Sequence, residues 1–424
     1  MHRVLIVSHF FPPHGGGGVH RALAWARHLP AFGWDVTVLA AGPSGAGVRD
    51  DSLLDRVPES TEILRVDAWS RVAPLRGRSA GSSGDGALRA LARLLLVPDS
   101  YRAWGTPAIR AGSKRIARGG IDVVISTSPP ETAHLVGEAL ARRARLPWIA
   151  DFRDPWVGLH YRKPASPLHH WLHRAMERRV LERADRVLCA SRAHEEQVLR
   201  TLGPLAGERV VFLPNGVETD TEPARPTAPK PGSRARIVAT GTLTEVPALL
   251  SFVDALGRRI ESHPRLAAQV EVVFAGPHDA LLPERVRARR LERVVSLPGA
   301  LPHAEARALQ RSAAVLLFAR NEGPGYRAMV PGKLYEYLDA RKPLVAMVDG
   351  GDAAELAREA GGAVFGPDEG EAALDAALLA ALGEPGAPLP DLPAIEQRLA
   401  GRTRRGLAGE LAGILDRVVQ PSQV

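Results

Sequence analysis

Short runs of aliphatic and β-branched residues recur along the chain, and each run is followed by glycine, proline, serine or aspartate and then by a helical pattern. In the first half of the chain these runs predict strands at 4–8, 35–40, 123–126, 148–151 and 186–190. In the second half they predict strands at 237–240, 271–275, 294–297, 314–318, 343–348 and 363–365. Strands that alternate with helices are typical of parallel sheets. The chain is therefore expected to be an α/β protein with two doubly wound, Rossmann-like domains.

A proline-rich segment without periodicity, residues 217–236, separates the two series and predicts an interdomain linker. The expected domains are residues 1–216 and 237–390. Within residues 391–424, a helix over 394–419 is expected to pack back toward the first domain. Doubly wound sheets bind ligands at the carboxyl ends of their strands. The expected ligand site is therefore a cleft between the carboxyl ends of the two strand sets.

The length of 424 residues fits two or three domains better than one. Lys and Arg number 55 and Asp and Glu 47, which gives a net charge of +8 and is compatible with an anionic partner: a nucleotide, an acidic lipid surface or nucleic acid. Net charge does not choose among these partners. Because arginine is abundant throughout the chain, a basic patch is weak support for any of them.

The single cysteine, Cys189, cannot form an intramolecular disulfide and fits a reducing cytoplasm. The first residues do not form the long apolar region of a secretory signal, and no apolar run approaches the roughly 18 residues of a membrane span. We expect a cytoplasmic protein without an integral membrane segment. No metal site is expected, because no Cys, His or carboxylate ligands cluster with metal spacing.

Residues 9–18, HFFPPHGGGG, follow the first predicted strand and precede a helical pattern. Glycines let the backbone approach a ligand closely, and the helix amino terminus behind them attracts anionic or hydroxyl-rich groups. The tract is not the GxGxxG of a dinucleotide fold, because two prolines precede it and no acidic residue ends the second strand. We interpret it as an acceptor or diphosphate loop, with a flexible surface loop as the alternative. Its candidate residues are Gly15, Gly16, Gly17, Gly18 and His20.

Residues 151–156, DFRDPW, end the fourth predicted strand, and their three charges are candidate catalytic groups. Asp151, Arg153 and Asp154 can form a self-satisfied ion pair. Alternatively, one carboxylate holds an acceptor hydroxyl while Arg153 favours the ionised state of that carboxylate. Four histidines are expected near the same edge, where each taken alone is more often structural than catalytic: His9, His14, His20 and His160.

Residues 321–339, NEGPGYRAMVPGKLYEYLD, predict a Gly- and Pro-rich loop and then a helix that begins near Lys333. A lysine at a helix amino terminus is a natural partner for a diphosphate, so Lys333 is a further candidate catalytic residue. Glu336 lies three positions further along the same helix face, and its carboxylate can accept two hydroxyl hydrogen bonds from a ribose. The alternative is a solvated Lys–Glu pair on a surface helix.

The order of these motifs, together with ADRVLCAS, FLPNGV, ATGTL, VVFAGP and VPGKLYEYLDARKPLVA, resembles that of retaining GT-B glycosyltransferases of the glycosyltransferase family 4 type. The resemblance extends from Val4 to about Phe365, and it depends on the order of the motifs rather than on any one of them. It implies that the first domain binds an acceptor and that the second binds a nucleotide-sugar.

By this resemblance, Glu336 matches the second, ribose-binding glutamate of the family's E-x7-E motif. The first glutamate would fall at Ala328, so its carboxylate is absent. The family uses that carboxylate on donor sugar hydroxyls. Here the backbone of residues 329–332 or the side chain of Glu322 is expected to substitute for it.

The loop after Thr240 reads GTLTEVP and has no cation where relatives usually place one against the diphosphate. Lys333 is then expected to carry more of the charge. Further help is expected from the hydroxyls of Thr242 and Thr244, or alternatively from Arg320 or Arg327. The resemblance implies a wider donor-binding set, in which residues 298–301 occupy the base-binding turn: Gly241, Gly276, Pro298, Leu301, Asn321, Glu322, Met329, Val330, Pro331 and Gly332.

The implied activity is transfer of a sugar, with retention of configuration, from a nucleotide-diphosphate sugar to an unidentified hydroxyl acceptor: a glycan, a lipid-linked sugar or a natural product. A UDP-sugar is the expected co-substrate, and no other cofactor is expected. No DxD pair is evident, so fixed cations and backbone amides are expected to stabilise the leaving diphosphate without a metal. Two alternatives remain: a sugar-nucleotide epimerase of the same fold, and a catalytically weakened sugar-nucleotide-binding subunit.

Two basic stretches, residues 88–118 and 169–186, carry leucine and tryptophan among many arginines. They are compatible with docking on an anionic membrane that holds a lipid-linked acceptor, and equally with solvated helices. The expected partners are thus a nucleotide-sugar and an acceptor, with peripheral contact at the inner membrane face as a further option. No nucleic-acid partner is expected.

Overall fold

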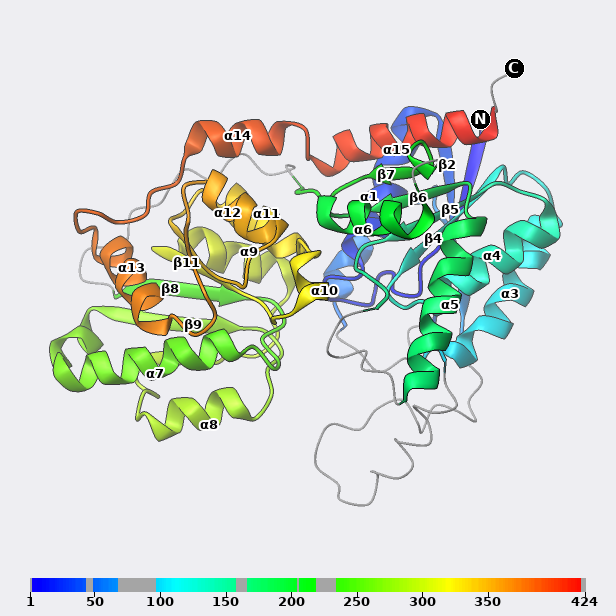
Figure 1. Cartoon of the computed structure of the whole chain (residues 1–424). Coiled ribbons are helices and arrows are strands. Elements are labelled where there is room, and N and C mark those ends of the chain that lie inside the picture. The colour runs from blue at the N-terminus through cyan, green and yellow to red at the C-terminus, as the bar shows by residue number, and fades with distance from the viewer. Residues whose placement is uncertain are drawn as a thin grey trace. The chain divides into compact units, whose positions relative to one another are not determined.

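The computed structural model describes residues 2–42, 49–67, 97–157, 166–203, 206–218 and 234–420 (Figure 1). The chain forms two compact units. We call them unit 1, which comprises Met1–Pro214 and Arg404–Val424, and unit 2, which comprises Asn215–Thr403. Each unit is built around a parallel sheet of its own.

The sheet of unit 1 has seven strands within the described residues, in the order β3-β2-β1-β4-β5-β6-β7. Neighbouring strands are parallel throughout, with Val4 of β1 opposite Val36 of β2 and Val123 of β4. The strands are β1 (His2–Val7), β2 (Trp34–Ala41), β3 (Glu62–Val66), β4 (Val123–Ser128), β5 (Trp148–Phe152), β6 (Arg186–Cys189) and β7 (Val210–Phe212). The direction of winding reverses between β1 and β4, which creates a switch point at the carboxyl edge.

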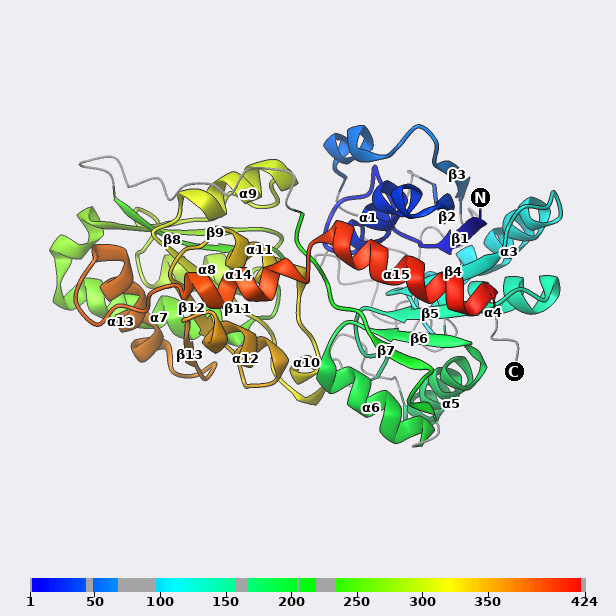
Figure 2. The same ribbon diagram turned by 90° about the horizontal axis from the view of Figure 1, so that it is seen from above.

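Helices cover both faces of this sheet (Figure 2). Successive side chains of a strand point to opposite faces, so strands that are apolar throughout need helices on both sides. In β1, Val4 and Ile6 lie in one buried core, whereas Leu5 and Val7 lie in the other. The core of Val4 and Ile6 is completed by α1 (His20–His28) and α15 (Arg404–Val419). The core of Leu5 and Val7 is completed by α3 (Arg102–Ile116), α4 (Thr132–Ala144), α5 (Pro167–Arg183) and α6 (Arg192–Leu202).

The sheet of unit 2 has six strands among the described residues, in the order β10-β9-β8-β11-β12-β13. They are β8 (Ala235–Thr240), β9 (Val270–Ala275), β10 (Val295–Ser296), β11 (Val315–Ala319), β12 (Leu344–Met347) and β13 (Ala363–Phe365). One face packs against α7 (Pro247–Ser262), α8 (Leu281–Ala288) and α13 (Gly370–Leu382). The other packs against α9 (His303–Ser312), α11 (Gly332–Asp339), α12 (Asp352–Glu359) and α14 (Leu392–Ala400). The short helix α10 (Pro324–Arg327) lies in the loop between β11 and α11.

All the strands predicted from the hydrophobic runs are present, but β3 and β7 were not predicted. Both are edge strands of the first sheet. Every residue of β3, EILRV, is only half-buried, and β7 has three residues. An edge strand has a single neighbour and needs fewer apolar side chains, so it leaves a weaker pattern in the sequence.

The helix predicted over 394–419 is in fact two helices, and the correction has a local cause. Gly401 ends α14, and Val217 then donates to the Arg402 carbonyl and pairs with Thr403. The first helix, α14, belongs to unit 2, whereas α15 packs on α1 in unit 1. The ends of the predicted linker also differ, because Val217 is buried in the core of unit 2 and β8 already begins at Ala235. Residues 219–233 of that linker lie outside the described residues.

Across the described ranges, no helix combines the length and the apolar character that crossing a membrane requires.

Candidate functional site

The motifs singled out in the sequence lie at the carboxyl edges of the two sheets. In unit 1 the glycine loop follows β1, and DFRDPW begins within β5. In unit 2 the loop of residues 241–244 follows β8, and residues 320–332 follow β11. The winding of the first sheet reverses between β1 and β4, and that of the second sheet reverses between β8 and β11. Such switch points are where doubly wound sheets bind ligands.

Asp151 is fully buried at the end of β5. Its carboxylate accepts hydrogen bonds from Arg21 Nη2 at 2.7 Å, from Arg21 Nε at 3.1 Å and from the Thr127 hydroxyl at 2.7 Å. Asp151 therefore has no exposed surface with which to contact an acceptor in this structure, and its predicted catalytic role stays a prediction. Its counter-ion is Arg21, in place of the predicted Arg153, and the pair holds α1 against the ends of β4 and β5.

Arg153 is also buried, and its guanidinium holds the backbone carbonyls of three residues at the end of β4 and in the adjoining loops. Nε donates to the Ser128 carbonyl at 2.8 Å, Nη2 to the Pro129 carbonyl at 2.6 Å and Nη1 to the Gly18 carbonyl. Burial lowers the pKa of Arg153, and the charges of Asp154 and Asp151 oppose that shift. The structure thus brings the glycine loop and the DFRDPW motif together through Arg153. Arg153 was predicted to favour the ionised state of a carboxylate, whereas here it binds backbone carbonyls.

The parts of these motifs that a ligand can reach are few. Asp154 is half-buried, as are Gly15 and His20. Gly16 and Gly17 are exposed, and a Cβ at either position would meet no atom within 4 Å. Gly16 has a φ of +82°, a conformation that favours glycine. The glycine loop therefore presents bare backbone to any ligand of unit 1.

Two of the predicted histidines are packed in the structure. The His9 ring lies 4.4 Å from the Tyr101 ring and 4.8 Å from the Trp104 ring, between centroids. His14 is buried with Nδ1 3.1 Å from the Phe11 carbonyl, and burial is the chief cause that lowers its pKa. His160 lies outside the described residues.

In unit 2, Lys333 lies in the first turn of α11 and reaches back over the loop after β8. Its Nζ donates to the Ala319 carbonyl at 3.1 Å and lies 5.2 Å from the centroid of the Phe318 ring. A Cβ added at Gly241 would lie 3.8 Å from Nζ. Burial lowers the pKa of Lys333 to about 8. Among the described residues no carboxylate pairs with this ammonium, which leaves its charge available to an anion.

Glu336, one turn further along α11, is held on both carboxylate oxygens. His303 Nε2 lies 3.0 Å from Oε1, and Gln310 Nε2 donates to Oε2 at 3.1 Å. Gln310 also donates to the Thr240 hydroxyl, at 2.9 Å. The Glu336 side chain is 13% exposed. The predicted alternative of a solvated Lys–Glu pair is therefore wrong, since the partners of Glu336 come from α9.

The loops after β8 and β9 approach each other so closely that glycine is required. A Cβ at Gly276 would lie 1.8 Å from the Gly241 carbonyl oxygen, and Gly241 N donates to the Ala275 carbonyl at 3.0 Å. Thr242 is exposed and Thr244 is half-buried. In the predicted base-binding turn after β10, Pro298 is exposed and Leu301 is half-buried. These predicted donor residues share the carboxyl edge with Lys333.

The loop after β11 is fixed by an arginine pair around Asp349. Arg320 is buried, and its Nη2 donates to Asp349 at 3.3 Å and to the Gly350 carbonyl. Arg327 donates to the other carboxylate oxygen at 3.2 Å, as does Gly323 N at 3.0 Å. Burial, as the largest cause, lowers the pKa of Arg320 to about 10. Arg320 is thus a positioning residue for the loop.

The remaining predicted residues of that loop differ in exposure. Asn321, Met329, Pro331 and Gly332 are half-buried, Val330 and Ala328 are buried, and Glu322 is exposed. Asn215 Nδ2 donates to the Val330 carbonyl at 3.2 Å and so anchors the end of the loop. The loop can therefore offer backbone groups at 329–332, whereas position 328 offers no polar side chain.

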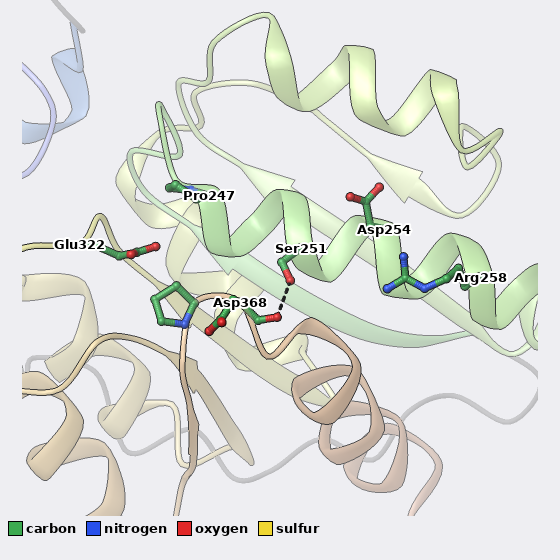
Figure 3. Close-up of a pocket in the computed structure, with 7 residues that line it drawn as sticks. Pro247, Ser251, Asp254, Arg258, Glu322 and Asp368 are labelled. Atoms are coloured by element: carbon green, nitrogen blue, oxygen red, sulfur yellow. Dashed lines mark hydrogen bonds between the residues drawn. The ribbon is translucent and has the colours of Figure 1, made fainter.

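A surface pocket of about 330 Å³ in unit 2 includes Glu322 (Figure 3). Figure 3 shows Glu322 at one end and Arg258 of α7 toward the other, with Ser251 donating to the Asp368 carbonyl between them. Two of the four charged side chains of the lining have ion-pair partners, since Asp254 binds Arg289 at 2.8 Å and Arg258 binds Glu371 at 2.7 Å. The pocket lining does not include Lys333 or Glu336.

Four residues that shape these sites were not predicted from the sequence: Arg21, His303, Gln310 and Asp349. Arg21 lies three positions after Gly18, and nothing in that spacing indicates that it pairs with a buried carboxylate. His303 and Gln310 are seven positions apart, so they share one face of α9. Their target lies on another helix, and spacing alone does not identify it.

Replacing Asp151 by Asn is predicted to destabilise unit 1 by about 3–5 kcal/mol, because Arg21 would remain buried without a carboxylate. Urea unfolding measures the loss. The matched control is Asp154→Asn, at a half-buried position, where we expect a change below about 1 kcal/mol. If Asp151→Asn unfolds as the wild type does and loses only activity, the positioning role is wrong.

Comparison with known families assigns both halves of the chain. Residues 16–216 match the family model described as "Glycosyl transferase 4-like domain", and residues 234–384 match "Glycosyl transferases group 1". No curated protein sequence matches the chain.

Solved structures share the fold at low sequence identity. A sucrose-phosphate synthase from Thermosynechococcus elongatus has 16% identity and a TM-score of 0.70 over 100% of both chains. A glycosyltransferase from Rickettsia africae has 13% identity and a TM-score of 0.67 over 99% of each chain. Anabaena HepE, in complex with UDP and glucose, has 15% identity and a TM-score of 0.65 over 98% of this chain and 99% of its own. With two Rossmann-like parallel-sheet units and family matches in both halves, the chain belongs to the glycosyltransferases of the GT-B fold.

Proposed function

We propose that this glycosyltransferase moves a sugar, with retention of configuration and without a metal, from a UDP-sugar to a hydroxyl acceptor. The observation that carries the proposal is the Lys333 ammonium, which has no carboxylate partner among the described residues and lies beside the loop after β8. HepE in complex with UDP-glucose and a trehalose-6-phosphate structure bound with UDP-2-fluoro glucose are fold relatives whose ligands support the choice of UDP.

In this proposal the diphosphate is held by Lys333 and the first backbone N–H groups of α11. The first N–H groups of a helix have no partner within it, and the helix dipole favours an anion there. As the bond between the anomeric carbon and the diphosphate breaks, negative charge grows on the leaving oxygen. Fixed donors stabilise that charge without reorganisation. Exposed Thr242 and half-buried Thr244 add hydroxyl donors at the same edge.

Glu336 is proposed to bind the ribose hydroxyls. His303 and Gln310 each hold one oxygen of this carboxylate, and a carboxylate oxygen can accept more than one hydrogen bond. Those two contacts fix the orientation of the carboxylate before the ligand arrives, which reduces the entropic cost of binding. Thr240 N donates to the Tyr337 hydroxyl at 2.6 Å, so α11 is also tied to the end of β8.

The donor sugar is proposed to contact backbone groups of residues 329–332 and the side chains of Asn321 and Glu322. Asp349 and the two arginines that share it hold this loop in place. The acceptor is proposed to bind at the glycine loop and Asp154 of unit 1. Arg153 holds this loop through the Gly18 carbonyl, and Asp151 holds α1 behind it through Arg21. No protein nucleophile is assigned, since the acceptor hydroxyl is proposed to attack the face from which the diphosphate leaves.

The test of the function is calorimetry with UDP and other nucleoside diphosphates, followed by a diphosphate-release assay over a panel of nucleotide-sugars. We expect UDP binding, and release that accelerates when an acceptor is added and persists in EDTA. Release without transfer would indicate an epimerase, and binding without release a binding subunit. Absence of binding to any common diphosphate would overturn the proposal, and activity restored only by Mg²⁺ or Mn²⁺ would overturn its metal-free part.

Replacing Lys333 by Ala is predicted to weaken UDP binding by about 1.5–3 kcal/mol, through loss of a charge-assisted contact. The charged ammonium is the binding form, and its pKa is about 8. Wild-type affinity should therefore fall as the pH rises through 8 toward 10. Lys333→Arg, which stays charged, should bind less tightly than the wild type at pH 7 but lose that pH dependence. Calorimetry at several pH values measures both effects, and an unchanged affinity in Lys333→Ala would exclude the diphosphate role.

Glu336→Ala and Gly17→Val are predicted to fail in different ways. Glu336→Ala should raise the KM for the donor and weaken UDP binding, because the ribose loses its acceptor. Gly17→Val should slow transfer to the acceptor while UDP binding persists. A Cβ at either position meets no atom within 4 Å, but Gly17 suits this test better than Gly16 because its φ is not in the left-handed region. Circular dichroism checks both folds. Equal loss of UDP affinity in the two variants would contradict the assignment of donor and acceptor to different units.

A further inference from the structure

The first half of α5 exposes two large apolar side chains on one face. Leu168 is 62% exposed and Trp171 is 63% exposed, and they lie three positions apart. Arg174 and Arg178 continue the same exposed face, which we call the α5 face. The opposite side of the helix packs into the core of unit 1 through Val180 and Leu181. The helix is therefore fixed to the sheet, and its apolar side chains point to solvent.

The arginines of α5 differ in their ion-pair partners along the helix. Toward its end, Arg179 and Arg183 both bind Glu138 of α4, at 2.8 and 2.5 Å. Arg178 pairs with Glu182 at 2.7 Å in an exposed contact, which contributes little. Arg174 is exposed directly after the two apolar side chains. The α5 face thus combines tryptophan, leucine and arginine, which is the combination that the boundary of an anionic bilayer accepts.

The position of the α5 face follows from the topology of unit 1. The helix follows β5, so its first turns lie at the carboxyl edge of the parallel sheet, where the glycine loop and Asp154 also lie. Figure 1 shows the first turns of α5 extending beyond the strands of the first sheet. A molecular surface that contacted Leu168 and Trp171 would therefore lie next to the carboxyl edge at which the acceptor is proposed to bind.

We infer that the α5 face docks unit 1 on an anionic lipid bilayer and that the acceptor is anchored in that bilayer. This inference rests on the proposed function for the role of the acceptor edge. A second copy of the chain is the competing occupant. Leu168 and Trp171 offer roughly 250 Å² of apolar surface, whereas a stable protein interface needs about 800 Å² from each partner. The small area and the adjacent arginine favour lipid, into which single side chains insert.

The test is sedimentation of the full chain with vesicles of phosphatidylcholine, with and without about one-third phosphatidylglycerol. We expect binding to the anionic vesicles only, and weaker binding at high salt because screening reduces the arginine contribution. The double variant Leu168→Ser with Trp171→Ser should lower the partition coefficient at least about tenfold. Arg174→Glu should lower it as well. UDP calorimetry on the same variants should give wild-type affinity.

The matched control is Leu281→Ser with Leu389→Ser in unit 2, two leucines that are 54% and 70% exposed. This variant should bind vesicles as the wild type does. The inference is overturned if the wild type ignores anionic vesicles, if the α5 double variant binds them normally, or if the control loses as much binding. Self-association of the wild type that the α5 double variant abolishes, without vesicle binding, would assign the face to a second copy.

A spectroscopic measurement identifies the inserted residue. Of the tryptophans that the structure describes, Trp171 is the exposed one, whereas the others are at most 2% exposed. Brominated lipids should therefore quench wild-type fluorescence. Trp171→Phe should keep vesicle binding and lose that quenching, and quenching that persists in Trp171→Phe would overturn insertion at this residue. The proposed function fails separately, if the wild type does not bind UDP.

Discussion

The carboxyl edge of unit 1 depends on one buried charge pair, Arg21 with Asp151. Both side chains are buried, so each requires the other as its counter-ion. Their hydrogen bonds also reach Thr127, Leu213 and Pro214. Those contacts fix α1 relative to the ends of β4 and β5 and to Leu213 and Pro214, which end the first segment of unit 1. Arg153 then extends the fixed region to Gly18 through its carbonyl contacts. Exposed glycine backbone is thereby presented on a fixed base, which suits the acceptor-binding role proposed for this loop.

At the carboxyl edge of unit 2, by contrast, the described residues do not supply a carboxylate partner for the buried cation Lys333. Glu336 is compensated by His303 and Gln310. Lys333, within the part of the chain that the structure describes, contacts a carbonyl and an aromatic ring but no carboxylate. Burial without a counter-ion is unfavourable for an ammonium, as its lowered pKa indicates. A diphosphate that supplied the missing negative charge would remove that penalty. The same placement allows Lys333 to serve the loop after β8, which has no cation of its own.

The departures from the family pattern also have structural counterparts. Ala328 is buried, so a long carboxylate has no exposed position there in this loop. Asp349 anchors this loop internally, because it binds Arg320, Arg327 and the backbone of Gly323. Gly276 must be glycine because the Gly241 carbonyl occupies the space of its side chain. Under the proposed function, specificity for the donor sugar would then depend on backbone groups and loop shape more than on one acidic side chain.

The sequence by itself determined the two parallel sheets, the position of every interior strand and the loops that carry chemistry, because alternating hydrophobic runs and glycine- or proline-rich breaks are local signals. It also placed Lys333 and Glu336 on one helix. It did not reveal the edge strands β3 and β7, whose single neighbour demands little of their side chains. Only the tertiary structure decided which charges meet: Asp151 pairs with a residue 130 positions away, Arg21, and Glu336 is held by residues of α9. Such pairings depend on how helices and strands are packed in three dimensions, and sequence spacing carries no information about contacts over that separation.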